Sequence, residues 1–145
     1  YRNFTIKDEA GEICAFANSV WVYMDTATMR PVRIAKEVQD AYIPVMDEAI
    51  QYEWADRKIR IEGTPVEKEP VLVQRFHMNN GKYILVAEEY LPENFKTESI
   101  RVEYKKAAVI GNMLYPEVYE QQNGVTIVLA DEQKVPYAIM QFRGK

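Results

Sequence analysis

The sequence predicts an α+β fold in which an antiparallel sheet curls around one long helix. Apolar residues at helical spacing between residues 83 and 91 indicate the helix. Strand-like segments joined by short turns follow it, and Asn123-Gly124 is the strongest hairpin signal in the chain. The 145 residues are 48% hydrophobic and 28% charged, which is enough apolar material for a globular core.

The first part of the chain, residues 1–34, has the pattern of β structure. Phe4 and Ile6 indicate a short strand, and the charged turn after it contains Gly11, which tolerates a positive φ angle. A second strand is predicted from Ile13 to Asp25, because that segment is rich in β-branched and aromatic residues.

We interpret residues 35–70 as a linker that contains a helix. Apolar residues recur at helical spacing from Lys36 to Ala49, and Pro44 should kink or end that helix. Residues 52–70 are charged, are interrupted by glycine and proline, and lack periodicity. They predict a connector that follows the surface.

Residues 71–145 predict a domain of strand, helix and four further strands. Val71 to Phe76 indicates the first strand, Asn79 or Asn80 can cap the helix, and Pro92 marks its end. The apolar face of the helix comprises Tyr83, Ile84, Val86, Ala87, Tyr90 and Leu91. The later strands are predicted at Ser99–Val109, Met113–Gln121, Val125–Asp131 and Pro136–Phe142.

Composition narrows the class of protein. The net charge of -4 and the pI of about 5.1 disfavour a nucleic-acid partner. No apolar run approaches the ~20 residues that span a bilayer, and the first residues lack the apolar core of a secretory signal. One cysteine, Cys14, precludes an internal disulfide, and one histidine with one cysteine does not suffice for a standard zinc site. We therefore expect a soluble, cytoplasmic protein.

Two blocks of motifs resemble one family. The first contains Ala17-x-Ser19-x-Trp21-Val22 and then Arg30-Pro31-Val32-Arg33-Ile34, with Met29 at a position where that family has an arginine. The second runs through Met78-Asn79-Asn80-Gly81-Lys82-Tyr83, Glu89-Tyr90-Leu91-Pro92 and Ile100 to Ala107. In this order and spacing they are similar to the bacterial-type acyl-acyl-carrier-protein (acyl-ACP) thioesterases.

The resemblance implies a tandem double hot-dog fold, in which each antiparallel sheet wraps around a central helix. Residues 1–34 would be the trailing strands of an incomplete N-terminal hot dog, and residues 71–145 would be the C-terminal hot dog. The chain would then lack the family's N-terminal part.

The catalytic loop of the family has the pattern Asp-x-Asn-x-His-x-x-Asn. His77 stands directly before Met78-Asn79-Asn80 and matches the histidine, but Val73 and Arg75 occupy the Asp and Asn positions. The expected explanation is that a short catalytic-loop segment is missing between Phe76 and Met78. If the junction is continuous in the protein, the acidic catalytic residue is absent.

Thioester hydrolysis requires a base, a group that polarises the carbonyl and a dry tunnel for the acyl chain. The resemblance assigns catalytic roles to His77, Asn79 and Asn80, at the start of a helix whose free N–H groups suit an oxyanion. Gly81 would let substrate approach the backbone. The alternatives are that Asn79 is an ordinary helix cap and that His77 is a surface residue.

Four further residues are predicted to bind substrate. Tyr83 belongs to the apolar helix face, which is mostly core and one end of which would line the acyl tunnel. Arg33, Lys105 and Lys106 would contact the acidic carrier protein, although each could equally be a solvated charge. The other basic candidates for this contact are Arg30, Lys36, Arg57, Lys58, Arg60 and Arg101.

The predicted function is hydrolysis of fatty acyl-acyl carrier protein to free fatty acid in fatty acid biosynthesis. The expected partner is the acyl-loaded carrier, with neither nucleic acid nor membrane, and a homodimer is compatible with the sequence. No metal or organic cofactor is expected, because hydrolysis of an activated thioester needs neither. Two alternatives stay open: an acyl-coenzyme A thioesterase, or a non-catalytic acyl-binding hot dog.

Two other mechanisms are disfavoured. A hot-dog dehydratase would need a proline-rich loop beside its histidine, and His77 has no proline nearby. Cys14 is expected to be a buried thiol that packs within a strand, with no basic neighbour to activate it. Ala107 and Ala108 follow Lys105-Lys106, where the plant members of the family have Glu-Cys. Attack by water is therefore favoured.

Overall fold

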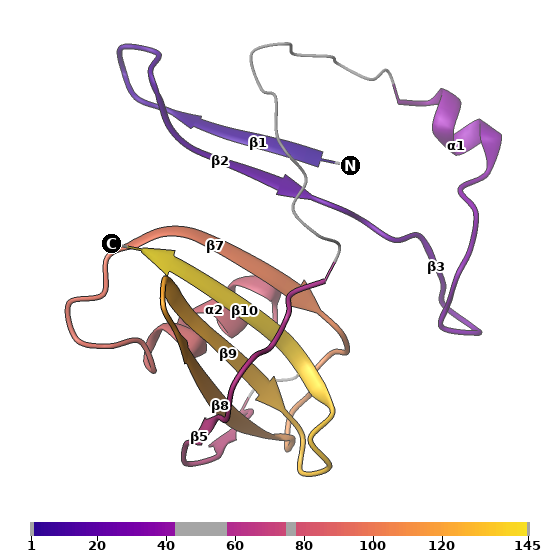
Figure 1. Cartoon of the computed structure of the whole chain (residues 1–145). Coiled ribbons are helices and arrows are strands. Elements are labelled where there is room, and N and C mark those ends of the chain that lie inside the picture. Colours follow the sequence, from indigo (N-terminus) through magenta and orange to yellow (C-terminus); the bar gives the residue numbers. More distant parts are fainter. Residues whose placement is uncertain (1, 43–57, 75–77, 145) are drawn as a thin grey trace. The chain divides into compact units, whose positions relative to one another are not determined.

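The computed structural model describes residues 2–42, 58–74 and 78–144. The chain divides into two compact units, residues 1–52 and 53–145 (Figure 1). The division lies inside the segment predicted to be a linker, and the predicted domain boundaries at residues 34 and 70 stay predictions.

Unit 1 contains the two strands that the sequence predicts at its start. Strand β1 (Arg2–Lys7) pairs antiparallel with β2 (Ile13–Ser19). The Asp8 carboxylate accepts hydrogen bonds from the N–H groups of Ala10 and Glu12 at 2.9 and 2.8 Å, and Gly11 takes a φ of +86°. The turn therefore has both of the features that its sequence predicts.

The predicted second strand is interrupted. β2 ends at Ser19, and a separate short pair follows, β3 (Met24–Asp25) with β4 (Arg30–Pro31). Helix α1 (Lys36–Asp40) starts where the sequence predicts a helix and has Ala41 as its C-cap. The remainder of that predicted helix, from residue 43, lies outside the described residues.

Unit 2 is an antiparallel sheet with one helix, α2, against one of its faces (Figure 1). Its elements in chain order are β5 (Val66–Glu67), β6 (Val71–Leu72), α2 (Asn80–Glu88), β7 (Thr97–Tyr104), β8 (Met113–Gln121), β9 (Gly124–Ala130) and β10 (Pro136–Gly144). The order across the sheet is β5-β8-β9-β10-β7, with β6 also paired to β8. The predicted α+β hot-dog arrangement of helix and antiparallel sheet is confirmed.

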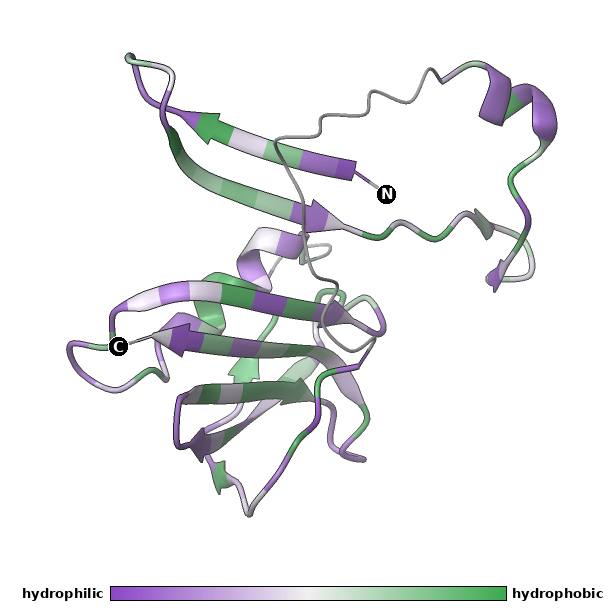
Figure 2. Cartoon of the chain, turned by 45° about the horizontal axis from the view of Figure 1, so that its top comes forward, coloured by the Kyte–Doolittle hydropathy of each residue, from purple (hydrophilic) through white to green (hydrophobic). Residues whose placement is uncertain are grey.

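The two faces of the sheet bury different residues. Tyr83 and Ala87 of α2 pack with Leu114, Ile127 and Met140 in the main core. On the opposite face, Ile59 packs against Val128, Ala130 and Ile139. Figure 2 shows that hydrophilic and hydrophobic residues alternate along β7, the strand at one edge of the sheet.

The predicted surface connector is partly incorporated into this sheet. Ile59 is buried, β5 pairs with β8, and the Lys134 ammonium joins Glu67 and Glu117 at 2.6 and 2.8 Å. Conversely, the strand predicted from Val71 to Phe76 is described as far as residue 74, and over that part it is paired as a strand only at its first two residues. After Leu72, the Val73 N–H and C=O bond to the turn at Gly111-Asn112 instead.

Candidate functional site

The start of α2 is a capped helix end, as the sequence predicts. Asn79 has an extended backbone, and its side-chain Oδ1 accepts the N–H of Lys82 at 3.0 Å. The carbonyl of Asn80 accepts the hydroxyl of Tyr104 at 2.9 Å. Within the described part of the chain, the N–H groups of Asn80 and Gly81 have no acceptor. First-turn N–H groups of this kind lie where a helix commonly binds an anionic oxygen.

Gly81 is exposed in the first turn of α2. A Cβ atom built there would meet only Asn79 Oδ1, at the ordinary contact distance of 3.7 Å. The fold of the described residues therefore does not require glycine at this position. The sequence-based explanation for a glycine at position 81, that it lets substrate approach the backbone, stays a prediction.

Tyr83 belongs to the core of unit 2. Its side chain is 2% exposed, and its hydroxyl oxygen accepts the N–H of Ala108 at 2.7 Å. The ring meets that of Tyr104 edge to face, with centroids 5.8 Å apart. Burial, and secondarily Tyr83, raises the pKa of Tyr104. Tyr83 thus anchors α2 to the segment after β7, and its role in substrate binding stays a prediction.

An apolar groove of about 420 Å³ runs beside α2. One wall is β6 with the residues after it, the other is α2, and Leu114 lies between them. Its lining residues are Val71, Leu72, Val73, Gln74, Met78, Lys82, Leu85, Val86, Glu89 and Leu114. Met78 and Lys82 flank Asn79 in the sequence, so the groove lies next to the capped helix start.

Lys82, Leu85, Val86 and Glu89 form the groove-lining side of α2, and of these the sequence interpretation singled out only Val86. The spacing i, i+3, i+4 and i+7 places these residues on one helix face, and that signal could have identified them. Our interpretation followed the more apolar face, which is the one that packs on the sheet.

The two adjacent lysines predicted to contact the carrier are both held within unit 2. Lys105 pairs with Glu103 at 2.5 Å, and Lys106 pairs with Asp131 while its ammonium lies 4.4 Å from the centroid of the Tyr137 ring. The pKa of Asp131 is lowered chiefly by the hydrogen bond from Lys106. Both lysines thus have acidic partners within unit 2, and their contact with a carrier protein stays a prediction.

The remaining predicted residues are not brought together with the helix start. His77 lies outside the described residues, as do Arg75, Phe76 and Arg57, so the continuity of the Phe76–Met78 junction is untested. Arg33 is exposed in unit 1, between β4 and α1. Its neighbour Lys36 pairs with Asp40 at 2.7 Å.

Cys14 lies in β2 as predicted, but the expectation that it is buried is wrong. Its side chain is exposed, because the described part of unit 1 is a hairpin without a buried layer against it. The thiol lies 3.8 Å from the carbonyl oxygen of Glu12.

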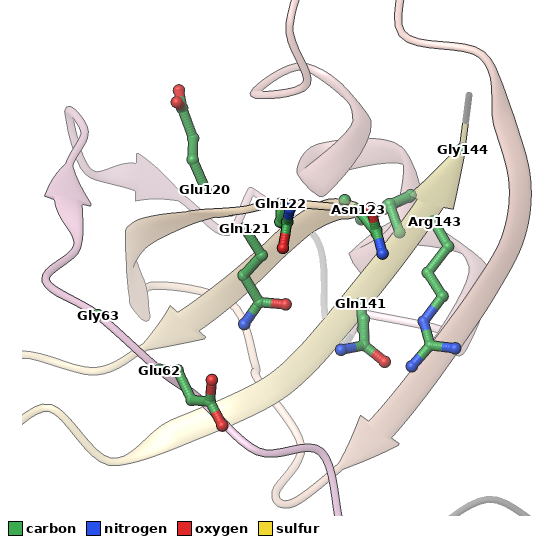
Figure 3. Close-up of a pocket in the computed structure, with 11 residues that line it drawn as sticks. Glu62, Gly63, Glu120, Gln121, Gln122, Asn123, Gln141, Arg143 and Gly144 are labelled. Atoms are coloured by element: carbon green, nitrogen blue, oxygen red, sulfur yellow. The ribbon is translucent and has the colours of Figure 1, made fainter.

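A second, polar hollow of about 650 Å³ lies at the β8–β9 hairpin (Figure 3). The register places Gln121, Gln141 and Arg143 on the sheet face opposite α2, and Glu120 points the other way. The hollow is thus separated by the sheet from the groove beside α2. Its amide and charged side chains provide no apolar channel.

Neither helix among the described residues has the length and apolar character to cross a membrane. Within residues 2–42, 58–74 and 78–144, no group of three or more His, Cys, Asp or Glu side chains lies together in a way that could hold a metal ion.

Comparisons with known proteins agree with this geometry. Residues 1–42 match the family model of the acyl-ACP thioesterase N-terminal domain. An acyl-ACP thioesterase from Bacteroides thetaiotaomicron is similar in structure over 99% of this chain, with a TM-score of 0.79 and 17% identity. No curated protein matches the sequence.

Two further solved structures are similar. A protein assigned as an oleoyl thioesterase from Lactobacillus plantarum aligns over 98% of this chain, with a TM-score of 0.69 and 23% identity. The 12:0-ACP thioesterase from Umbellularia californica aligns over 99%, with a TM-score of 0.68 and 19% identity. The chain spans 61% of the length of each of the three solved chains. The fold of the chain is thus similar to that of these thioesterases, and its first 42 residues match the family model of the acyl-ACP thioesterase N-terminal domain.

Proposed function

We propose that the protein hydrolyses the thioester of fatty acyl-acyl carrier protein and releases a free fatty acid. The observation that carries this proposal is the adjacency of the capped start of α2 to the apolar groove. The family match over residues 1–42 supports the same activity. A groove of this kind can hold an acyl chain while the helix start faces its polar end.

In this proposal His77 and the residues at the helix start perform different parts of the reaction. His77 removes a proton from water, and the resulting hydroxide attacks the thioester carbonyl. The N–H groups of Asn80 and Gly81 donate to the oxyanion, while Asn79 holds the first turn in place. Collapse of the intermediate expels the carrier thiolate, which takes up the proton, and leaves the fatty acid. Water is the only co-reactant.

In this proposal the partner is the carrier protein, and the protein acts in the cytoplasm. It binds neither nucleic acid nor a membrane. A net charge of -4 supports the exclusion of nucleic acid. A homodimer fits the proposal. Docking would use exposed basic residues such as Arg33, because Lys105 and Lys106 already have acidic partners. A KM that depends strongly on salt with carrier substrates, but not with coenzyme A substrates, would favour the carrier.

The test is release of fatty acid and free thiol from acyl carriers of several chain lengths. We expect hydrolysis by the parent chain, and a loss of ~10²-fold or more in His77→Ala, the usual scale for a lost acid–base group. Unchanged turnover in His77→Ala would remove His77 from the mechanism. Absence of any hydrolysis would contradict the proposal.

Gly81→Ala provides a matched test of the helix start. The added methyl group has space and favours helix by about 1 kcal/mol, so the variant should fold at least as well as the parent. Its turnover should nevertheless fall, because the methyl group occupies the approach to the backbone N–H groups. Full turnover in this variant would place the oxyanion elsewhere.

The second candidate is a non-catalytic acyl-binding protein, and one observation favours it. Val73 occupies the position of the family's catalytic aspartate when residues are counted back from His77, and it is buried in the apolar core. An intact-mass measurement checks whether Phe76, His77 and Met78 are contiguous in the protein. Fatty acid binding without hydrolysis would support this candidate.

A further inference from the structure

We propose that the groove beside α2 orients its ligand by charge. The carboxyl end of a fatty chain lies at Lys82, and Glu89 at the other end limits how long a chain the groove accepts. This inference deepens the proposed function, on which it rests for the thioester but not for the binding of fatty acids.

The charged residues lie at the two ends of one helix face. Lys82, Leu85, Val86 and Glu89 all line the groove and are spaced i, i+3, i+4 and i+7 along α2. Glu89 lies seven positions after Lys82, which corresponds to roughly 10 Å along the helix axis. Between them the helix contributes only the apolar side chains of Leu85 and Val86, with Leu72 on the opposite wall. The groove is therefore positive, apolar and negative in succession.

Helix stability does not explain this arrangement. A helix is stabilised by anionic side chains in its first turn and by cationic ones in its last. In α2 the first turn has the cation Lys82, and Glu88 and the C-cap Glu89 are anions at the opposite end. Within the described residues, neither the Lys82 ammonium nor the Glu89 carboxylate has an ion-pair partner. Charges that oppose the helix dipole without compensation indicate a role outside folding.

The same charges suit a fatty carboxylate in one orientation. Its anionic end is attracted by the Lys82 ammonium and by the positive end of the α2 dipole. Its apolar chain covers Leu85, which is 63% exposed, and Leu72, which is 50% exposed. A chain that reached Glu89 would remove water from a carboxylate without giving it a partner, which is unfavourable. The reversed orientation places the ligand carboxylate beside Glu89 and is repelled.

The first test measures the binding of fatty carboxylates and of the alcohols of the same chain length by displacement of a fluorescent fatty acid. The parent chain should prefer the carboxylate, and Lys82→Met should reduce that preference roughly fivefold, the scale of a partly exposed ion pair. Lys96→Met is the matched control, because Lys96 is exposed and does not line the groove. An equal preference in Lys82→Met and in the parent would overturn the assignment of the carboxyl end.

The second test concerns chain length. Glu89→Leu should raise the affinity for chains longer than the optimum of the parent roughly tenfold relative to shorter ones, because two or so further methylene groups then find an apolar surface. Glu88→Leu, exposed and outside the groove, should leave the length profile unchanged. An unchanged profile in Glu89→Leu, or the same shift in Glu88→Leu, would overturn the inference.

The two proposals fail separately. If the parent binds fatty acids with the expected profile but hydrolyses no acyl carrier, the thioesterase proposal fails and the orientation of the ligand stands. If it hydrolyses acyl carriers and Glu89→Leu and Lys82→Met leave both binding and the length profile of hydrolysis unchanged, the orientation fails and the activity stands. If it binds no fatty acid, the inference is wrong.

Discussion

The two units of the chain differ most in what they bury. Among the described residues, every buried hydrophobic side chain belongs to unit 2, from Ile59 to Phe142. In unit 1, Phe4, Phe16 and Trp21 are each more than half exposed, and in Figure 2 apolar residues occupy most of β2. An isolated two-stranded hairpin is at best marginally stable. The match to the family model therefore lies in unit 1, whose described residues include no buried hydrophobic side chain. The candidate site lies in unit 2, which has a hydrophobic core.

The largest contrast is expected from deleting an aromatic side chain in each unit. Phe142 is fully buried in the main core, so Phe142→Ala should lower the free energy of unfolding by about 3–5 kcal/mol. Phe16→Ala, at a side chain that is 62% exposed, should change it by less than about 0.5 kcal/mol. Urea unfolding followed by circular dichroism measures both. Equal losses would mean that unit 1 contributes a core of its own.

A smaller contrast is expected from the hairpin glycines. A Cβ atom at Gly124, at the start of β9, would overlap the backbone carbonyl of Phe142, so Gly124→Ala should cost about 2–3 kcal/mol by forcing β9 and β10 apart. Around Gly11 there is open space, and only its φ of +86° opposes a side chain. Gly11→Ala should therefore cost about 1 kcal/mol. Amide hydrogen exchange along β2 and β9 locates each effect, and a larger cost at Gly11 would reverse this comparison.

The smallest contrast concerns acid stability. Asp131 in unit 2 and Asp25 in unit 1 both have a pKa below the usual 3.8, through the hydrogen bond from Lys106 and through hydrogen bonds from Thr28 respectively. Because the folded pKa is the lower one, each carboxylate stabilises the fold above the unfolded pKa. That stability is lost as pH falls through the folded pKa.

Asp131→Asn should therefore flatten the loss of unit 2 stability below about pH 4, and Asp25→Asn should leave it unchanged. Unfolding measured between neutral and acid pH, with NMR titration of both carboxylates, checks this prediction. A titration midpoint for Asp131 at or above 3.8 would contradict the inference that the hydrogen bond from Lys106 lowers its pKa.

The parts of the fold that could be predicted from sequence are those in which local signals agree. The predicted bounds of β8, Met113–Gln121, coincide with the observed ones, because glycine turns stand on both sides. The predicted cap at Asn79 is confirmed for the same kind of reason, since a side-chain acceptor precedes an apolar helix face. β5 could not be predicted, because its two residues pair with β8 through contacts distant in sequence and have no periodicity.

The candidate site could be predicted only where it coincides with a local signal. The helix start was identified, but the groove beside it depends on β6 and Leu114, which the fold brings to α2 from other parts of the chain. Lys105 and Lys106 have the charge that an acidic partner requires, yet their acidic neighbours Glu103 and Asp131 are apparent only in three dimensions. A sequence shows that a side chain is charged, but it does not show whether an oppositely charged side chain lies beside it in the fold.

The strand wall of the groove is fastened to the rest of the sheet. In the wall itself, β6 pairs with β8 and Val73 exchanges backbone bonds with the turn at Gly111-Asn112. The segment before the wall is held too, because β5 pairs with β8 and the Lys68 N–H donates to Pro116. On the other side, the hydrogen bonds that hold α2 to the segment around β7 reach only its first half, at Asn80 and Tyr83. A bulky ligand would therefore displace the helix rather than the strand, pivoting it about its N-terminal turn. The capped start of α2 would then stay fixed while the far end of the groove yields.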